Sequence, residues 1–455
     1  MTAGFLAETL AAHGWQATAG EPAAEIRDGS ADSRLVKPGD VFAGFRGEQQ
    51  DGNAYLERAL EAGATAVVGE RAVEGNWPDR AIAVVPDTRA AVATLAGAWR
   101  ARCNPQVVGI TGTVGKTTAK EFCAAVLRQH FRTHKSKENF NSREGLPLTL
   151  ASLETSHEVS VLEMAMDSRG EIRELCEIAR PDVGIVLNVG LTHVSKLGSV
   201  EAIQAEKLSL AGWLPESGVA VLNADDPLVA PAIGHVRARV ISFGRALDAT
   251  LRIGEVDDHG LDGCSFALSH GQETATVRSP LPGAHLVPAA TVAVASAMAL
   301  GVPFQAAAAS VESAEAAGRM GIRRLENGVT VLDDTYNSSP ASLEGALRLL
   351  GNAEGRRIAV LGAMAELGDY EAPEHRRLGT IAAGQADLVL AAGAPCRDLV
   401  DAAREAGLAN ARWYETREEL GEALARELRA GDVVLLKASR SQAFEALLPA
   451  IEGAT

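Results

Sequence analysis

The sequence has few cysteines and no long apolar run. Its five cysteines in 455 residues are scattered, odd in number and free of C-x-x-C spacing, which argues against a disulfide framework and a cysteine zinc site. No window reaches 18 uninterrupted apolar residues, and Val287–Val302 predicts a short buried helix rather than a membrane span. The stretch Met1–Gly20 contains Glu8 and His13 and lacks the pattern of a signal peptide. We expect a reduced, cytoplasmic protein without membrane insertion.

Positive charge is also scarce. Lys and Arg number 43 against 59 Asp and Glu, a net charge of −16, so the average surface repels phosphodiester backbones and anionic lipid headgroups. Nucleic acid is therefore not an expected partner. A small anionic substrate remains compatible with this charge, because a local pocket can be positive inside a negative envelope.

The length predicts about three domains, at roughly 100–200 residues each. Residues 1–86 mix short strands with a helix and form a small N-terminal α/β domain. Residues 87–316 begin with a helix over Asp87–Arg102, for which Asp87 is the predicted N-cap. Alternating strands and helices follow, interrupted between Leu251 and Val277 by period-2 segments that predict a small antiparallel excursion. Residues 317–455 repeat the alternation.

The predicted strands of the second and third domains are short apolar runs, the type that parallel sheets bury on both faces. They are Val107–Thr111, Val159–Glu163, Val183–Val189, Val219–Asn223, Val329–Asp333, Ile358–Gly362, Leu388–Ala392 and Val433–Lys437. Strands that alternate with helices predict a doubly wound α/β sheet. We therefore expect a central doubly wound domain of P-loop type and a Rossmann-like C-terminal α/β domain.

The strongest local motif follows the first of these strands, where Gly112–Thr118 leads into a helix with one apolar face. Glycines let successive N–H groups surround phosphate oxygens, and the helix N-terminus adds partial positive charge. Lys116 supplies an ammonium and Thr117 a hydroxyl for Mg²⁺. The literal G-x-x-x-x-G-K-[ST] pattern is not met, because the residue five before Gly115 is isoleucine, and an ordinary glycine-rich turn is the alternative. We predict that ATP binds, with Mg²⁺, to Thr111, Gly112, Thr113, Val114, Gly115, Lys116, Thr117 and Thr118.

Three further residues stand beyond strand ends, where α/β enzymes carry their chemistry. Glu163 closes one strand, His193 follows another, and Lys207 lies on the predicted helix Ser199–Leu214. Glu163 and His193 can bind Mg²⁺, although magnesium prefers oxygen donors. Taken singly, Glu163 is more typical of a helix-capping acid and His193 of a loop histidine. The spacing of Lys207 is typical of a solvated helix face, and its ammonium would repel a metal.

Motifs in a fixed order connect the three predicted domains, and by them the chain resembles the Mur ligases, the ATP-dependent amide-bond-forming enzymes of peptidoglycan precursor synthesis. The likeness spans nearly the whole chain. The motifs are Asp32–Asp40, Phe42, Gly47–Gly52, Thr111–Thr118, Asn139–Asn141, Gly145–Thr149, Glu163–Met164, Gly170–Ile172, Asn188–Gly190, His193, Lys207, Leu222–Pro227, Gly318–Met320, Asp333–Asn337, Pro340, Leu361–Gly362, Glu366–Gly368, Lys437 and Ser439–Ser441.

The resemblance implies roles for the candidate residues. Thr117, Glu163, His193 and a carbamylated Lys207 would hold magnesium, and CO₂ explains the lysine because it replaces a cation with two anionic oxygens. Lys116, Lys207, His193 and Glu163 would be the catalytic residues. The first domain would bind a uridine nucleotide, and ATP would also be contacted from the third domain. The residues implied for these contacts are Ser33, Arg34, Asn139 and Asn141 for the uridine substrate, Arg319 and Asp334 for ATP, and Tyr336 and Asn337 near the substrates.

Within the family, Asp333–Pro340 and Lys437–Ser441 are similar to the branch that joins D-alanyl-D-alanine to UDP-N-acetylmuramoyl-tripeptide (UDP-MurNAc-tripeptide) through an acyl phosphate. The Asp-Asn-Pro-Arg signature of the diaminopimelate-adding branch is absent. The alternatives are another Mur-type ligase with a different acceptor, folylpolyglutamate-type enzymes included, and a nucleotide-binding paralogue that does not ligate. Leu286 and Ala289 depart from the family pattern, which usually carries asparagine at both positions. We expect a monomer.

Overall fold

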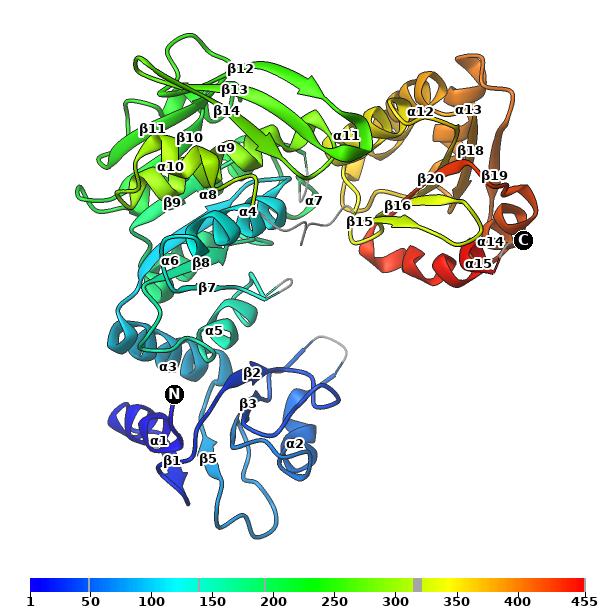
Figure 1. The fold of residues 1–455 in the computed structure, drawn as a ribbon. Helices are drawn as coiled ribbons and strands as arrows, with labels where there is room; N and C mark the ends of the chain where they lie inside the picture. The colour runs from blue at the N-terminus through cyan, green and yellow to red at the C-terminus, as the bar shows by residue number, and fades with distance from the viewer. Residues whose placement is uncertain (48–49, 138–139, 192–193, 314–320, 454–455) are drawn as a thin grey trace.

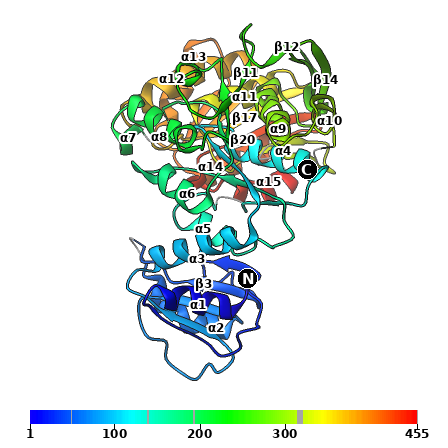
Figure 2. The ribbon, with the colours of Figure 1, turned by 90° about the vertical axis from the view of Figure 1, so that its left-hand side faces the viewer.

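The computed structural model describes residues 1–455 apart from 48–49, 138–139, 192–193, 314–320 and 454–455. The described strands form sheets of five, nine and six strands, one in each successive part of the chain. Figure 1 shows the central unit between the other two, with the N-terminal unit at one end and the C-terminal unit beside it. Figure 2, turned by 90°, also separates the N-terminal unit from the rest.

The N-terminal sheet has the strand order β1-β5-β4-β3-β2, with β1 antiparallel to β5 and the other pairs parallel. Helix α1 begins at Thr2, whose hydroxyl accepts the N–H of Phe5, and it packs its apolar face on the sheet. The elements are α1 (Ala3–Ala12), β1 (Gln16–Ala19), β2 (Asp28–Ser30), β3 (Asp40–Ala43), α2 (Leu56–Glu61), β4 (Ala66–Gly69) and β5 (Ala81–Val84).

Helix α3 (Thr88–Cys103) joins the N-terminal unit to the central unit. It begins as predicted, because the carboxylate of Asp87 accepts the N–H of Ala90. Its first half contributes Ala91, Val92 and Leu95 to the N-terminal core. Its second half contributes Ala96, Trp99 and Cys103 to the central core. A helix shared in this way gives no sharp boundary, so the limit between residues 86 and 87 stays a prediction.

The central sheet has the order β14-β13-β12-β11-β10-β9-β6-β8-β7. Its pairs from β7 to β12 are parallel, and β12, β13 and β14 form the predicted antiparallel excursion. The strands are β6 (Gln106–Thr111), β7 (Thr133–Lys135), β8 (Val159–Glu163), β9 (Val183–Val186), β10 (Val219–Asn223), β11 (Arg239–Gly244), β12 (Leu251–Asp258), β13 (Cys264–His270) and β14 (Glu273–Ser279).

Helices cover both faces of this sheet, as a doubly wound fold requires. On one face α4 and α9 pack against the strands and against each other, and α10 packs beside them. On the other face lie α3, α6 and α8. The helices are α4 (Lys116–Arg128), α5 (Gly145–Leu150), α6 (Glu171–Ala179), α7 (Val194–Leu197), α8 (Val200–Trp213), α9 (Val287–Ala299) and α10 (Phe304–Ala309). Among the described residues, no helix combines the length and apolarity needed to cross a bilayer.

The C-terminal sheet has the order β15-β16-β20-β17-β18-β19, parallel except for the β15–β16 pair. Helices α11, α12 and α13 contribute to the core on one face, and α14 and α15 to the core on the other. The elements are β15 (Gly321–Arg324), β16 (Thr330–Asp334), α11 (Pro340–Gly351), β17 (Arg356–Gly362), α12 (Glu371–Gln385), β18 (Leu388–Ala392), α13 (Cys396–Glu405), β19 (Ala411–Tyr414), α14 (Arg417–Glu427), β20 (Asp432–Lys437) and α15 (Leu448–Glu452). The predicted boundary at 316/317 falls outside the described residues.

Candidate active site

The glycine-rich loop lies between β6 and α4, at the carboxyl edge of the central sheet. Gly115 precedes the first helical residue with φ 82°, a left-handed conformation that glycine adopts without strain. The side chain of Asn188, which follows β9, accepts the N–H of Val114 at 2.9 Å and donates to its carbonyl at 3.0 Å. The hydroxyl of Thr113 accepts the N–H of Gly190 at 2.7 Å. The neighbouring strand exit therefore holds the loop in place.

The amino groups of two lysines meet at the carbonyl oxygen of Gly112. Lys116 Nζ lies 2.8 Å from this oxygen and 3.2 Å from that of Thr113, and Lys207 Nζ lies 3.0 Å from the Gly112 oxygen. Lys207 is 1% exposed. Burial, followed by the charge of Lys116, holds the pKa of Lys207 well below its ordinary 10.5, while Glu206 acts in the opposite direction. A cation is therefore disfavoured at this position.

The solvated surface position that spacing alone favoured for Lys207 is wrong. Helix α8 buries Ile203, Lys207 and Leu210 on one stripe, a spacing of four and three residues that defines a single helix face. A lysine on an apolar stripe was the available signal, because burying an ammonium is costly unless it serves a purpose.

Glu163 ends β8 and is fully buried. Its two carboxylate oxygens accept hydrogen bonds from Thr117 Oγ1 at 2.7 Å and from Asn141 Nδ2 at 2.8 Å. These are neutral donors, and a buried carboxylate beside a hydroxyl and an amide offers the oxygen ligands that magnesium prefers. His193 lies outside the described residues. Within the described ranges, no three His, Cys, Asp or Glu side chains form a candidate metal cluster.

The phosphate loop faces the C-terminal unit across a cleft of about 520 Å³. On the C-terminal side, Lys437 is 1% exposed, pairs with the carboxylate of Asp334, and donates to the carbonyl of Asn337 at 2.9 Å. The N-terminus of α11 lies next to this pair. The cleft is lined from the central unit by Thr113–Thr118, Asn141, Glu163, Ala165, Asp167, Leu187, Asn188, Asn223, Leu281, His285, Leu286, Pro288 and Ala289, and from the C-terminal unit by Asp334, Tyr336–Ser339, Ala341, Ser342 and Lys437.

The cleft differs in character from one side of the phosphate loop to the other. Toward β8 it offers the polar group of Asn141, Glu163 and Asp167, whereas at the N-terminus of α9 its wall is mostly apolar. Helix α11 approaches that wall closely, because a Cβ on Gly345 would lie 2.8 Å from Cγ of His285. The motifs indicated the polar side, included Lys437 in a family motif without a role of its own, and marked Leu286 and Ala289 of the apolar wall as departures at positions linked to adenine recognition. The wall residues are Leu281, Leu286, Pro288, Ala289 and Ala341.

The residues predicted for the uridine substrate are not all gathered in this cleft. Asn141 lines it, whereas Ser33 is buried and Arg34 exposed on the N-terminal unit, where Arg34 pairs with Asp32 at 2.6 Å. An ion pair between Asp28 of β2 and Lys137 links this unit to the segment that leads to Asn141. Two other predicted residues, Asn139 and Arg319, lie outside the described residues.

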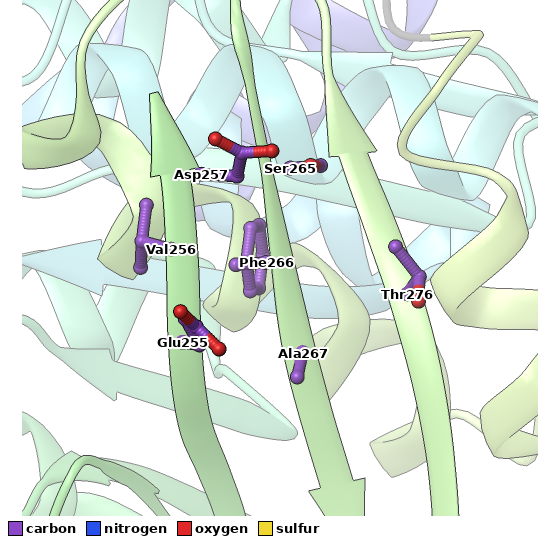
Figure 3. A pocket seen from close by; sticks show the side chains of 7 residues that line it. All are labelled: Glu255, Val256, Asp257, Ser265, Phe266, Ala267 and Thr276. Carbon is purple, nitrogen blue, oxygen red and sulfur yellow. The ribbon is translucent and has the colours of Figure 1, made fainter. Parts of the chain in front are cut away.

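A second hollow, of about 440 Å³, lies on the antiparallel strands β12–β14. Figure 3 shows Asp257 and Ser265 on neighbouring strands near one end and Ala267 toward the other. The register of β12 against β13 shifts between Ile253 and Val256, next to this hollow. It shares no lining residue with the interdomain cleft.

Known proteins match this chain over most of its length. Three family models match in succession: the Mur ligase family catalytic domain over residues 25–109, the Mur ligase middle domain over 110–297, and the Mur ligase glutamate ligase domain over 318–440. A Synechocystis protein named UDP-N-acetylmuramoyl-tripeptide--D-alanyl-D-alanine ligase is 37% identical, over 92% of this chain and 90% of its own length.

Solved structures of similar proteins also share the fold of this chain over nearly its whole length. A crystal structure of MurF from Acinetobacter baumannii superposes with a TM-score of 0.85 and 28% identity, covering 99% of this chain and 98% of that one. MurF from Thermotoga maritima in complex with ADP gives a TM-score of 0.79 and 28% identity, covering 94% and 97%.

The fold defines a class of protein, the three-domain ligases that use a nucleotide. Its features are a central doubly wound unit with a glycine-rich loop, a second α/β unit that faces this loop, and a small N-terminal sheet. The amide-forming members of this class include the enzymes matched above. The chain belongs to the Mur ligase family, and it is a ligase.

Proposed function

We propose that this chain joins D-alanyl-D-alanine to UDP-MurNAc-tripeptide and converts ATP to ADP and phosphate. The tripeptide carboxylate attacks the γ-phosphate to give an acyl phosphate, and the dipeptide amine then attacks the acyl carbon and releases phosphate. The names of the relatives support this choice of substrates. This reaction is a step of peptidoglycan precursor synthesis.

The observation that carries the proposal is the cleft itself. It brings Lys116 and the N-terminus of α4 from the central unit opposite Lys437 and the N-terminus of α11 from the C-terminal unit. Both helix ends and both ammoniums favour anions. The reaction joins two anions, a carboxylate and a phosphate, and unit charges 4 Å apart repel by about 4 kcal/mol at an effective dielectric constant of 20. The two ammoniums and the two helix ends lower that barrier on the sides of the cleft that they face.

The two sides of the cleft suggest an orientation for ATP. The phosphates lie on residues 111–118, and the base lies against the apolar wall at the N-terminus of α9. The carboxylate to be activated approaches from the side of Asn141 and Glu163, which continues toward the N-terminal unit. On that unit we assign the uridine nucleotide to the turn that carries Ser33 and Arg34, and we assign Asp334 to the nucleotide from the C-terminal side.

Glu163, with the hydroxyl of Thr117, is suited to magnesium, and His193 is the third proposed ligand. When bound, magnesium supplies charge neutralisation at the phosphates. Carbamylation of Lys207 completes this ligand set, and a neutral amine is the form that reacts with CO₂. The lowered pKa of Lys207 provides that form, because burial and Lys116 disfavour the ammonium. We assign the enzyme to the cytoplasm as a monomer.

The proposal is tested by measuring phosphate release with ATP, UDP-MurNAc-tripeptide and a panel of acceptors. D-alanyl-D-alanine should be the acceptor that supports turnover, and the product should gain two alanine residues by mass. Turnover with single amino acids or glutamate instead would identify a sister ligase. No turnover with any acceptor, together with retained ADP binding, would indicate a non-ligating paralogue.

Lys116→Ala is the matched test of the phosphate loop. This variant should release no phosphate, because the loop loses the ammonium nearest to Gly112 and Thr113. Arg239→Ala, which removes an exposed cation at the start of β11 in the same unit, is the control and should retain wild-type turnover. Turnover near the wild-type rate in Lys116→Ala would remove this residue from the site.

A further inference from the structure

Three charged side chains join the central and C-terminal units at the rim of the cleft. Lys196 Nζ, on α7, lies 3.0 Å from Asp167 Oδ2 and 3.0 Å from Glu366 Oε1. Asp167 lines the cleft, and Glu366 belongs to the C-terminal unit. Figure 1 shows α7 on the side of the central unit that faces the C-terminal unit. We call Asp167, Lys196 and Glu366 the clasp.

The backbone of Glu366 is held in a costly conformation. Its φ is 64°, in the left-handed region that residues other than glycine rarely adopt. Such strain persists only where the surrounding structure fixes it, and it gathers at functional sites. The motif Glu366–Gly368 belongs to the sequence pattern of the family, but neither the phosphate loop nor the magnesium ligands give it a function.

Three side chains fix the loop that carries Glu366. Their acceptor atoms take the backbone N–H groups of the three residues that follow β17. Gln442 Oε1 accepts from Ala363 at 3.1 Å, His375 Nε2 from Met364 at 3.1 Å, and Ser439 Oγ from Ala365 at 2.8 Å.

The same loop is coupled to the cleft through the segment that follows β20. Ser439 binds the loop twice, because its N–H also donates to the carbonyl of Ala363 at 3.2 Å. Ser439 stands two residues after Lys437, which lines the cleft and pairs with Asp334. A shift of Glu366 relative to Lys196 is therefore transmitted to the Lys437 end of the cleft.

We propose that Lys196 and Glu366 are positioning residues, which set the orientation of the C-terminal unit over the phosphate loop through the clasp. They act on the reaction by placing Lys437 and α11 opposite Lys116, without touching substrate themselves. The activity readout rests on the proposed function, whereas the placement of the two units does not.

Lys196 keeps its positive charge in the clasp. Partial burial acts to lower the pKa of Lys196, but hydrogen bonds to Asp167 and Glu366 outweigh it and raise that pKa above the ordinary 10.5. The side chains are 41%, 61% and 36% exposed for Lys196, Asp167 and Glu366, respectively. Solvent and salt therefore screen the ion pairs of the clasp, so their contribution to holding the two units together decreases as the salt concentration rises.

The units also meet away from the cleft, at the turn between β12 and β13. Asn352 Nδ2 donates to Asp258 Oδ2 at 3.1 Å, Arg324 pairs with Asp262 at 3.6 Å, and Leu261 packs against the C-terminal core. Removing the clasp therefore leaves the units in contact at this turn and frees their relative orientation at the other edge.

The test uses the full chain with Lys196→Met, Glu366→Gln and the double variant, and with Glu405→Gln as the control. Glu405 pairs with Arg376 within the C-terminal unit at 2.5 Å and is also exposed. Each single clasp variant should lower kcat by about 1.4-fold to fivefold, the range of an exposed ion pair. The double variant should lose no more than Lys196→Met alone, because that variant already removes the Lys196–Glu366 pair that Glu366→Gln breaks. ADP affinity should stay within about twofold, since the phosphate loop lies on the central unit.

Three results would overturn the proposal: single variants with wild-type kcat, a double variant whose loss is the product of the two single losses, or a loss of ADP affinity as large as the loss of kcat. Small-angle scattering provides a readout independent of the reaction. The clasp variants should have a larger radius of gyration than wild type and Glu405→Gln, and 1 M NaCl should shift wild type to the same value. Equal radii would also reject the clasp, whereas absence of wild-type turnover alone would reject only the proposed substrates.

Discussion

Replacement of Lys207 tests the chemistry of the site most directly. Lys207→Ala removes the amine that lies 3.0 Å from the Gly112 oxygen and with it any carbamate. Loss of one preorganised electrostatic group from an active site typically lowers kcat by about 10²–10³, or about 2.7–4 kcal/mol. The proposed carbamate would put an anion, in place of a cation, opposite Lys116, so its loss would also remove a favourable charge pair. We therefore expect a loss of at least about 10² in phosphate release.

Stability should change in the opposite direction from activity. The lowered pKa means that the fold disfavours the charged amine, so Lys207→Met, which keeps the volume of the side-chain stem, should unfold at a temperature no lower than wild type. Lys207→Ala leaves space where the stem was buried and should be less stable than Lys207→Met. Thermal unfolding of both variants, followed beside phosphate release, separates folding from chemistry.

Small carboxylates distinguish a carbamate from a simple ammonium. Acetate or formate should restore part of the activity of Lys207→Ala, because the space left by the stem admits them, but not that of Lys207→Met, whose side chain fills it. Removal of CO₂ from the buffer should slow wild type and leave both variants unchanged. Wild-type turnover by Lys207→Ala would refute the assignment, and rescue by amines rather than carboxylates would show that the site needs a cation.

The pH dependence has a definite sign. The pKa of Lys207 is lower in the fold than in the unfolded chain, so acid forces a proton onto a buried amine at a cost in stability. As pH falls through the lowered pKa, the neutral amine disappears and carbamate formation stops. Wild-type activity should therefore fall toward acid pH, whereas the stability of Lys207→Met should lack this contribution. An acid limb that is unchanged in the stability profile of Lys207→Met would contradict this explanation.

Three further predictions concern other parts of the molecule. Asp334→Asn leaves the buried Lys437 ammonium without its carboxylate, which costs about 3–5 kcal/mol and should lower the temperature at which the C-terminal unit unfolds. Adding Lys437→Met should restore the stability of that unit but not turnover. An unchanged unfolding temperature in Asp334→Asn would refute this prediction. Burial lowers the pKa of His134 from 6.5 to about 3, so between these pH values the unfolded chain binds a proton that the native state does not. The free energy of unfolding should therefore fall as pH drops through that range, and it should fall less in His134→Gln. Denaturant titrations at several pH values measure both effects. Finally, the apolar wall with Leu286 and Ala289 should discriminate ATP from ITP by less than about 10²-fold in kcat/KM, and Ala289→Asn should raise that ratio; a discrimination of about 10⁴ in wild type would show that the wall reads the base by hydrogen bonds.

The limits of several strands were predictable from local pattern, whereas β7, β11, β15 and β19 were not predicted. The predicted limits of Val159–Glu163, Val219–Asn223 and Leu388–Ala392 coincide with β8, β10 and β18, because short apolar runs between polar residues define a buried strand. The exit of β9 was predicted three residues too long. It ends at Val186 because Asn188 leaves the sheet to bind the phosphate loop at Val114, a partner 74 residues away that no local pattern contains.

The sequence by itself determined the fold class, the three α/β units and the glycine-rich turn between β6 and α4, because each of these depends on apolar periodicity or on backbone geometry within a few neighbouring residues. Only the tertiary structure decided which charges meet: Lys207 at the carbonyl of Gly112, Lys437 with Asp334, and Lys196 with Glu366. The partners in these pairs are 95, 103 and 170 residues apart. The energy of a charge depends on burial and on its nearest opposite charge, and both are set when sheets and domains pack against one another.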